Sequence, residues 1–308
     1  MKNYLVIAAA ALLALVSCSH GADCGRHGLV DSKDWFIVKD ITPQNGIGKV
    51  YLISEQYKAT AYLVTGSKGA MLIDTGYGIG DFAGLVRSLT PLPLVVVNTH
   101  GHVDHVAGDY QFSQIWLPAK DMDIYSTTLP WGDRDVEAYA KANLAGFDYD
   151  QATLSKNAAE VAAYEPNKVN LFDEGKTWDL GGKVIKTVEL AGHTPGSMMF
   201  VDAADDMLFS GDAMNGQLWM WLDHCLSLEE YAANLRAAMP KFMHLSRIYG
   251  GHELSEEGVP MSQAQNILRD VESVLAGEHA PEITPAPMPV GRDSVKVYTF
   301  ETWQVIAK

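Results

Sequence analysis

The chain has 308 residues, of which 47% are hydrophobic and 20% charged, enough for one large domain or two small ones. Its formal net charge is −15 and it contains no basic run, which argues against nonspecific nucleic-acid binding. We therefore expect a globular protein whose chemistry must be read from its motifs.

The N-terminus differs from the rest of the chain. Lys2 is followed by an apolar stretch, residues 6–16, that has the length of a signal peptide and is too short to span a bilayer. The stretch ends in Leu15-Val16-Ser17-Cys18, which resembles the lipobox of bacterial lipoproteins. That resemblance implies a signal peptide over residues 1–17, a lipid on Cys18 and a bacterial envelope location. The alternative is an ordinary signal peptide with an incidental cysteine.

Residues 19–33 are polar, so we expect residues 18–33 to form a tether and residues 34–308 to form the folded domain. Two cysteines remain after Cys18. Cys24 and Cys225 could pair in an exported protein, but their separation gives no evidence for a disulfide. Cys225 is more simply explained as a small buried hydrophobic residue.

Strand and helix signals alternate along the domain, which predicts an α/β fold. Glycines at both ends of residues 66–69 predict a hairpin between two of the strands. Ser227 is a candidate N-cap. The predicted helices cover residues 82–89, 227–239 and 262–275. The predicted strands cover residues 35–41, 49–54, 61–64, 70–73, 94–98, 115–117, 184–190, 198–201, 207–210, 247–249 and, as the last strand, 295–300.

Residues 121–168 break this alternation. They contain two alanine-rich stretches of helical period and several aromatic side chains. We predict a helical insertion that either packs on the core or forms a lid over a site.

Four metal-competent side chains lie within six residues, directly after an apolar strand. They are His100, His102, Asp104 and His105. Three imidazoles and one carboxylate held this closely are stabilised by a bound cation, and without thiolates the set favours a borderline metal such as Zn²⁺.

Four further metal-competent side chains each follow a strand and adjoin glycine. They are Asp74, His193, Asp212 and His252. Glycine at such a position lets the backbone turn sharply, so the loops can converge on one point. A single instance is weak evidence, but together with the histidine cluster these segments predict one metal site.

With these five segments in this order, the chain resembles the metallo-beta-lactamase superfamily over residues 35–260. The resemblance implies an αββα sandwich with two metal ions at one edge of the sheets. It implies that His100, His102 and His193 hold the first metal ion, while Asp104, His105 and His252 hold the second. Asp212 would bridge the two ions, and Asp74 would orient a ligand imidazole.

The implied chemistry is hydrolysis by a zinc-dependent enzyme. Two Zn²⁺ ions would acidify a bridging water to hydroxide, and Asp104 would handle the proton. The expected substrate is an ester, lactone, thioester or amide of a small molecule. One alternative is an iron-dependent oxidoreductase that resembles persulfide dioxygenases. Another is a non-catalytic metal-binding envelope lipoprotein.

The branches of the superfamily differ near the bridging position. True beta-lactamases usually carry Cys or Ser there, whereas this chain has Asp212. The residues after Asp212 lack the Gly-Cys-Gly-Arg stretch of glyoxalase II enzymes, and Asn215 stands where lactonases commonly have Tyr. Trp219, Trp221 and His224 are candidates for the substrate side, but the two tryptophans could equally be core residues. An apolar pocket there would favour a small uncharged substrate.

Overall fold

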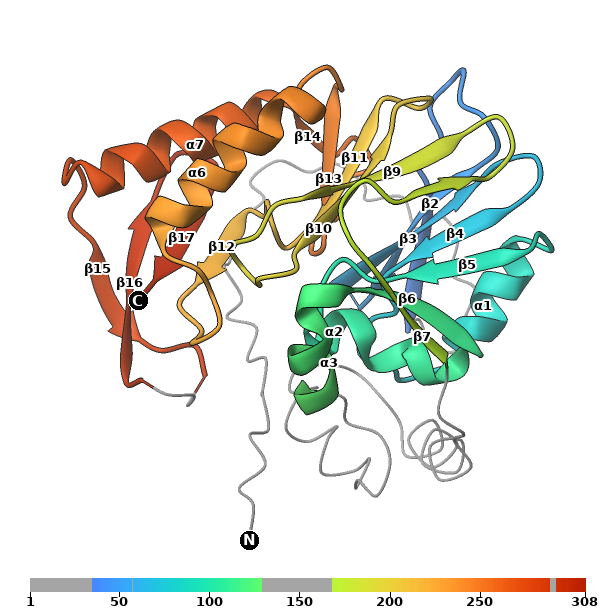
Figure 1. Ribbon diagram of the computed structural model, residues 1–308, viewed down its shortest axis with the longest axis horizontal. Coiled ribbons are helices and arrows are strands. Elements are labelled where there is room, and N and C mark those ends of the chain that lie inside the picture. Colours follow the sequence, from blue (N-terminus) through green and yellow to red (C-terminus); the bar gives the residue numbers. More distant parts are fainter. Residues whose placement is uncertain (1–34, 57, 129–167, 289–291) are drawn as a thin grey trace, which may run out of the picture.

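The computed structural model describes residues 35–56, 58–128, 168–288 and 292–308 (Figure 1). The expected signal peptide and tether, with Cys18 and Cys24, lie outside the described residues, as do residues 129–167 of the expected insertion. The described beginning of that insertion is helical, in α3 (Met122–Thr128). Among the described helices, none combines the length and the apolar character that a membrane span requires.

The first sheet has seven strands whose order in space follows the chain. The first four strands pair antiparallel, and β4 to β7 pair parallel. Helix α1 (Phe82–Leu89) makes the crossover from β4 to β5, as a parallel connection requires. The strands are β1 (Phe36–Asp40), β2 (Val50–Glu55), β3 (Ala59–Thr65), β4 (Ala70–Ile73), β5 (Leu94–Val97), β6 (Gln114–Pro118) and β7 (Lys168–Phe172).

The second sheet has six strands, in the order β14-β13-β11-β10-β9-β8. Its strands β11 and β13 are parallel, and the remaining neighbours are antiparallel. The strands are β8 (Thr177–Asp179), β9 (Val184–Glu189), β10 (Met198–Asp202), β11 (Met207–Gly211), β13 (Arg247–Gly250) and β14 (Val259–Pro260).

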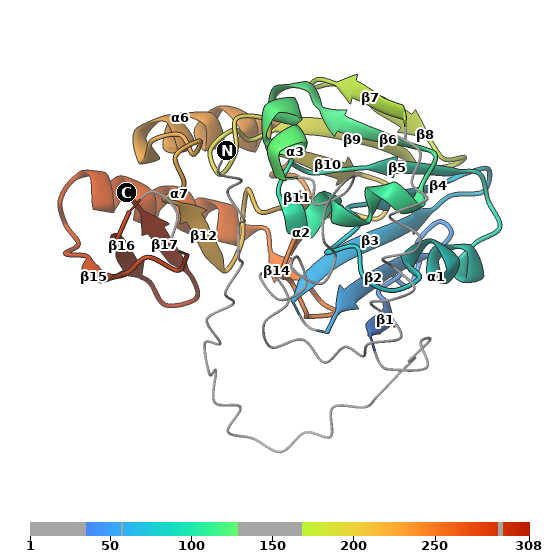
Figure 2. The same ribbon diagram turned by 90° about the horizontal axis from the view of Figure 1, so that it is seen from below.

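A third, four-stranded sheet lies at the C-terminal end, in the order β12-β17-β16-β15. Helices α6 (Leu228–Ala238) and α7 (Ser262–Leu275) lie beside it (Figures 1 and 2). The predicted strand at residues 295–300 is found as β16, but it is not the last strand, because the chain reverses and β17 pairs with both β16 and β12. The strands are β12 (Gln217–Met220), β15 (Glu282–Pro285), β16 (Ser294–Thr299) and β17 (Gln304–Ala307).

The two large sheets face each other across an apolar core. Strand β3 shows how the layers are built, because all of its residues are buried and alternate between two clusters. Leu63 packs toward α1, whereas Tyr62 and Val64 pack toward the second sheet, against residues such as Phe209. With α6 and α7 packed beyond the second sheet, this arrangement confirms the predicted αββα sandwich.

Several predicted elements are found where local sequence signals placed them. The hairpin between β3 and β4 turns at residues 66–69, and α1 and α7 span the predicted residues. Helix α6 starts at the expected cap, where Ser227 and Glu230 form a capping box. These features depend on neighbouring residues alone, which explains why sequence located them.

Candidate metal centre

The candidate site lies where loops follow strands of both large sheets. Asp74 follows β4, the histidine cluster follows β5 and enters α2 (Val103–Val106), and Asp212 directly follows β11. His193 lies between β9 and β10, and His252 lies between β13 and β14. The strands thus deliver seven candidate ligand side chains to one place. Three overlapping groups among them are close enough to hold a metal ion: His100, His102 and His193; His100, His105 and Asp212; Asp104, His105 and His252.

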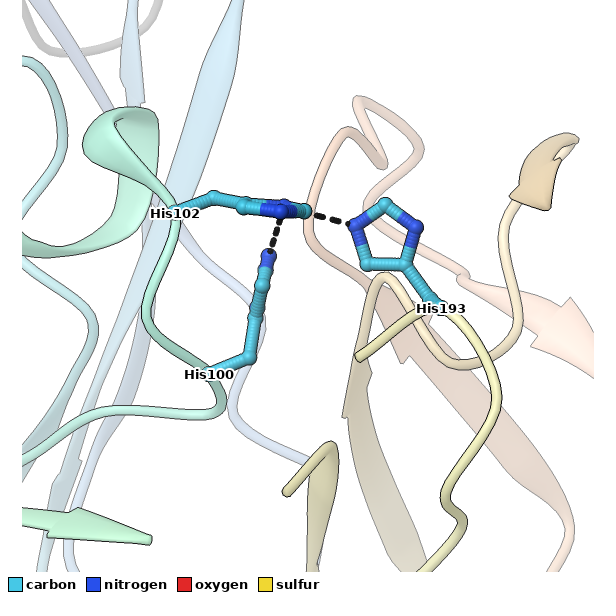
Figure 3. A group of neighbouring side chains, drawn as sticks. All are labelled: His100, His102 and His193. Carbon is cyan, nitrogen blue, oxygen red and sulfur yellow. Dashed lines mark hydrogen bonds between the residues drawn. The ribbon is translucent and has the colours of Figure 1, made fainter. Parts of the chain in front are cut away.

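The first group is formed by three buried imidazoles whose rings point at one another (Figure 3). Nδ1 of His102 lies 3.0 Å from Nε2 of His100 and 2.9 Å from Nε2 of His193. Two nitrogens on one tetrahedral zinc ion lie about 3.3 Å apart, given Zn–N distances of about 2.0–2.1 Å. Only a small outward movement of the rings would therefore accommodate an ion.

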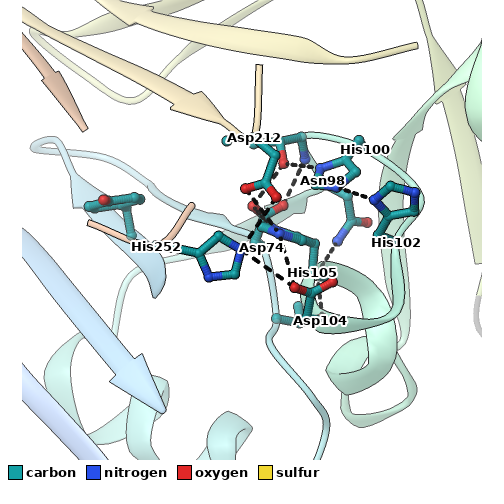
Figure 4. A network of polar contacts seen from close by, with 12 residues as sticks. Asp74, Asn98, His100, His102, Asp104, His105, Asp212 and His252 are labelled. Atoms are coloured by element: carbon teal, nitrogen blue, oxygen red, sulfur yellow. Dashed lines mark hydrogen bonds and ion pairs between the residues drawn. The ribbon is translucent and has the colours of Figure 1, made fainter. Parts of the chain in front are cut away.

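The other four ligands, two imidazoles and two carboxylates, form a second cluster beside the first group (Figure 4). Nε2 of His105 lies 3.7 Å from Asp104 and 3.4 Å from Asp212. Nε2 of His252 lies 3.5 Å from Asp104 and 3.3 Å from Asp212. Asp212 also lies 3.7 Å from Nε2 of His193, so this one carboxylate contacts both groups.

In three of the histidines, the hydrogen bond made by Nδ1 leaves Nε2 as the nitrogen that can bind a metal. Nδ1 of His193 lies 2.7 Å from the carbonyl oxygen of Trp219, and Nδ1 of His105 lies 2.8 Å from Asp74. Nδ1 of His252 similarly contacts the carbonyl oxygen of Lys58. Each of these partners only accepts, so each Nδ1 must donate, and a neutral ring then presents the lone pair of Nε2 to the centre.

The buried Nε2 of His105 shows why a cation fits. It has no hydrogen-bond partner, although two carboxylates lie within 4 Å. A lone pair that faces carboxylate oxygens is unfavourable unless a proton or a metal ion lies between them. The donor set of five imidazoles and two carboxylates suits a borderline divalent ion such as zinc.

The pKa values of the ligand histidines shift in opposite directions in the two clusters of the site. Burial and the neighbouring imidazoles hold the pKa values of His100 and His102 well below the usual range, which keeps these rings neutral. Burial also opposes charge on His105 and His252, but nearby carboxylates outweigh it and raise both pKa values, that of His252 to about 9. Around His105 and His252, a divalent ion would take the place of the protons on these rings, which the neighbouring carboxylates otherwise stabilise.

Asp74 fixes the start of the histidine cluster. Its carboxylate accepts hydrogen bonds from the backbone N–H and the hydroxyl of Thr99, at 2.7 and 2.9 Å, besides the one from His105. Its backbone has a φ of 66°, a left-handed conformation that Asp tolerates better than most residues. Asp74 therefore holds His105 through the nitrogen that faces away from the centre.

Glycine is required where the His252 loop passes the site. A Cβ on Gly251 would lie 2.4 Å from a carboxylate oxygen of Asp212 and 2.6 Å from the His105 ring. Any other residue would push the loop away from both.

The sequence did not reveal the supporting roles of two residues, Asp121 and Asn215. Asp121 is fully buried and accepts hydrogen bonds from the backbone of Gly101 and from the hydroxyl of Thr194 and the backbone of Gly196. It thereby joins the loop of His102 to the loop of His193. Asn215 donates to Asp212 at 2.7 Å, a role that an uncharged residue three positions after a ligand does not reveal.

The three substrate-side candidates lie in different environments. Trp221 is fully buried in a cluster with Met288 and Ile306, so its side chain belongs to the core. Trp219 is partly buried against Trp221, and its backbone oxygen supports His193. His224 lies against His102, with the two Nε2 atoms 2.8 Å apart.

Cys225 follows His224 and is buried, with no disulfide partner among the residues that the structure describes. Its sulfur contacts the carbonyl oxygen of His193 at 3.1 Å, and burial raises its pKa to about 12. The thiol therefore stays protonated at neutral pH and does not act as a metal ligand in this arrangement. Its pairing with Cys24 is not tested, since Cys24 lies outside the described residues.

Comparisons with known proteins all indicate one family. A family model described as the Metallo-beta-lactamase superfamily matches residues 56–287. The acyl-coenzyme A thioesterase MBLAC2 of Bos taurus is 27% identical over 215 residues, which cover 62% of this chain and 71% of that protein. The hydroxyacylglutathione hydrolase GloC of Haemophilus influenzae is 27% identical over 150 residues, which cover 48% of this chain and 62% of that protein.

Solved structures show the same fold. The DIM-1 metallo-beta-lactamase superposes with a TM-score of 0.51 at 15% identity, and the match covers 77% of this chain and 98% of that one. At this identity the likeness establishes the architecture of the two sheets and leaves the substrate open.

Proposed function

Because the chain belongs to the metallo-beta-lactamase superfamily and is a metal-dependent hydrolase, we propose that it binds two zinc ions and hydrolyses a small-molecule thioester or ester. The observation that carries the proposal is the position of Asp212, whose carboxylate contacts His193 on one side and His105 and His252 on the other. A carboxylate shared in this way suits two ions. His100, His102 and His193 would hold one ion, and Asp104, His105 and His252 would hold the other.

The bound ions would supply a water molecule acidified toward neutral pH and positive charge near the developing oxyanion. The chain's own residues prepare the site for this chemistry. Burial of His100, His102 and His105 excludes bulk water and strengthens electrostatic interactions around them. Asp104 is less buried, with 15% of its side chain exposed, and is the carboxylate we assign to proton transfer.

The ligands that are available for proton transfer determine which leaving group the site suits. The imidazoles turn their lone pairs inward, and Asp212 is the carboxylate shared between the two ions. Asp104 is therefore the ligand that we assign to proton transfer. A thiol leaving group, with a pKa of about 8.5, departs as a thiolate without a proton, whereas an amine does not. The site is thus better suited to thioesters and activated esters than to amides. The acyl-coenzyme A thioesterase and the hydroxyacylglutathione hydrolase, both named for thioester substrates, support the same class.

The proposal is tested with His102→Ala and with His244→Ala as the matched control, because His244 is exposed on a surface turn. We expect the unmodified chain and His244→Ala to bind two zinc ions and to turn over thioesters in a panel that also holds oxoesters, lactones, beta-lactams and phosphodiesters. His102→Ala should lose both activity and zinc. Hydrolysis that persists after complete metal removal would refute the proposal. Expression in iron-rich and zinc-rich media, followed by metal analysis, separates it from iron-dependent oxidation.

We further propose that residues 1–17 are a signal peptide and that Cys18 carries the lipid that anchors the domain to a bacterial envelope. The support is the lipobox-like sequence Leu15-Val16-Ser17-Cys18. Mass spectrometry of the mature N-terminus checks this, and an unmodified Cys18 in the envelope fraction would contradict it.

A further inference from the structure

His224 lies in the loop between β12 and α6. It contacts His102, a ligand of the proposed metal site, at the ring nitrogen that faces away from the other ligands. Its Nε2 lies 2.8 Å from Nε2 of His102, and the two ring centroids are 4.9 Å apart. The opposite nitrogen of His102, Nδ1, is the one that faces His100 and His193. We propose that His224 is a positioning residue that holds His102 in the tautomer able to bind metal through Nδ1.

Metal binding through Nδ1 of His102 fixes the donor and acceptor roles of the two neighbouring rings. A neutral imidazole carries one N–H donor and one lone-pair acceptor. For His102 to offer a lone pair at Nδ1, its hydrogen must be on Nε2, where it points at His224. His224 must then accept with its own Nε2. If His224 donated from Nε2 instead, the hydrogen of His102 would move to Nδ1 and block the ligand position.

The loop that carries His224 is fastened to the loop of another ligand. The backbone N–H of Leu226 donates to Gly192 at 2.9 Å, and the thiol of Cys225 contacts the carbonyl oxygen of His193 at 3.1 Å. Lys308 adds a hydrogen bond to the carbonyl oxygen of Cys225 at 2.8 Å. The positions of His193 and His224 are therefore set together, although the two rings contact opposite nitrogens of His102.

This role differs from direct contact with substrate. The Nε2 of His224 is already engaged by His102, so that nitrogen is not available to a ligand. Metal-bound histidines usually donate their second nitrogen to a carboxylate, carbonyl or water, and loss of that partner typically weakens metal binding by about 10- to 100-fold. Here an imidazole takes the place of those partners.

The inference rests on the proposed function, because it assumes that His102 binds metal. His224→Phe keeps a planar ring but removes the acceptor. His224→Gln is the conservative variant, since the amide oxygen of Gln reaches about as far as Nε2 and can only accept. His244→Gln serves as a control for the same change at an exposed histidine. Zinc affinity is measured by competition with a chelator. The hydrogen on Nε2 of His102 is followed by its ¹H–¹⁵N signal and by its exchange with solvent in the zinc-loaded protein.

We expect His224→Phe to weaken zinc binding by about 10-fold or more and to speed the exchange of the Nε2–H of His102 with solvent, because that N–H loses its acceptor. His224→Gln should restore most of both, and His244→Gln should change neither. Unchanged zinc affinity and unchanged Nε2–H exchange in His224→Phe would overturn the inference alone, provided that the unmodified chain binds zinc. If the unmodified chain binds no metal, the proposed function fails instead. A loss that His224→Gln does not rescue would indicate packing rather than hydrogen bonding, and would also overturn the inference.

Discussion

Replacement of Asp121 by alanine tests whether a buried carboxylate holds the two histidine loops together. The change removes the acceptor for three donors: the backbone N–H groups of Gly101 and Gly196, and the hydroxyl of Thr194, at 2.9, 2.6 and 2.7 Å. A buried donor left without a partner costs about 1–3 kcal/mol. Relief of the carboxylate's own burial offsets part of this loss, so we expect a net decrease of about 3 kcal/mol in the free energy of unfolding.

A graded series strengthens the test. One oxygen of Asp121 serves Gly101 and Thr194, and the other serves Gly196. Asp121→Asn can keep the first set but turns an NH₂ group toward the N–H of Gly196. Its loss should therefore be smaller, about 1–3 kcal/mol. Asp123→Ala, an exposed change two residues away, should stay within about 0.5 kcal/mol of the unmodified chain.

The assay is urea unfolding followed by tryptophan fluorescence, with a chelator present so that metal binding does not contribute to stability. A repeat with zinc reports whether the loops still present His102 and His193 at metal-binding distance, because a weaker site gives a smaller gain in stability. If Asp121→Ala unfolds at the same urea concentration as Asp123→Ala, the reasoning about these three hydrogen bonds is wrong.

Two further predictions concern buried side chains. Burial raises the pKa of Asp109 to about 8, so the unfolded chain binds fewer protons than the folded chain between about pH 4 and 8, and stability from this group is lost as pH rises. Asp109→Asn should therefore gain stability relative to the unmodified chain between pH 5 and 8, as measured by urea unfolding with chelator; a pH-independent difference would contradict this. Trp221→Ala should lower the free energy of unfolding by about 3–5 kcal/mol, because the side chain is fully buried. The partly exposed Trp219 should lose less in the same substitution, and a loss at Trp221 no larger than that at Trp219 would contradict this expectation.

The sequence by itself determined the candidate ligands and the elements that carry them. His100, His102, Asp104 and His105 are neighbours in the chain, and the apolar run before them predicts the strand that presents them. Helices α1 and α7 could be located because periodicity and flanking residues are local signals. The family resemblance extended this to His193, Asp212 and His252, since each follows a strand beside glycine.

The tertiary structure decided which residues support the site and how the C-terminal part folds. Strand β12 pairs with β17, more than eighty residues away along the chain, and such parallel pairing leaves little local signal. Asp121 contacts two loops, one of them more than seventy residues away, and His224 meets His102 across 122 positions. A hydrogen bond between distant residues depends on the position of both backbones. Only the folded chain could therefore show that a histidine from the β12–α6 loop contacts Nε2 of His102.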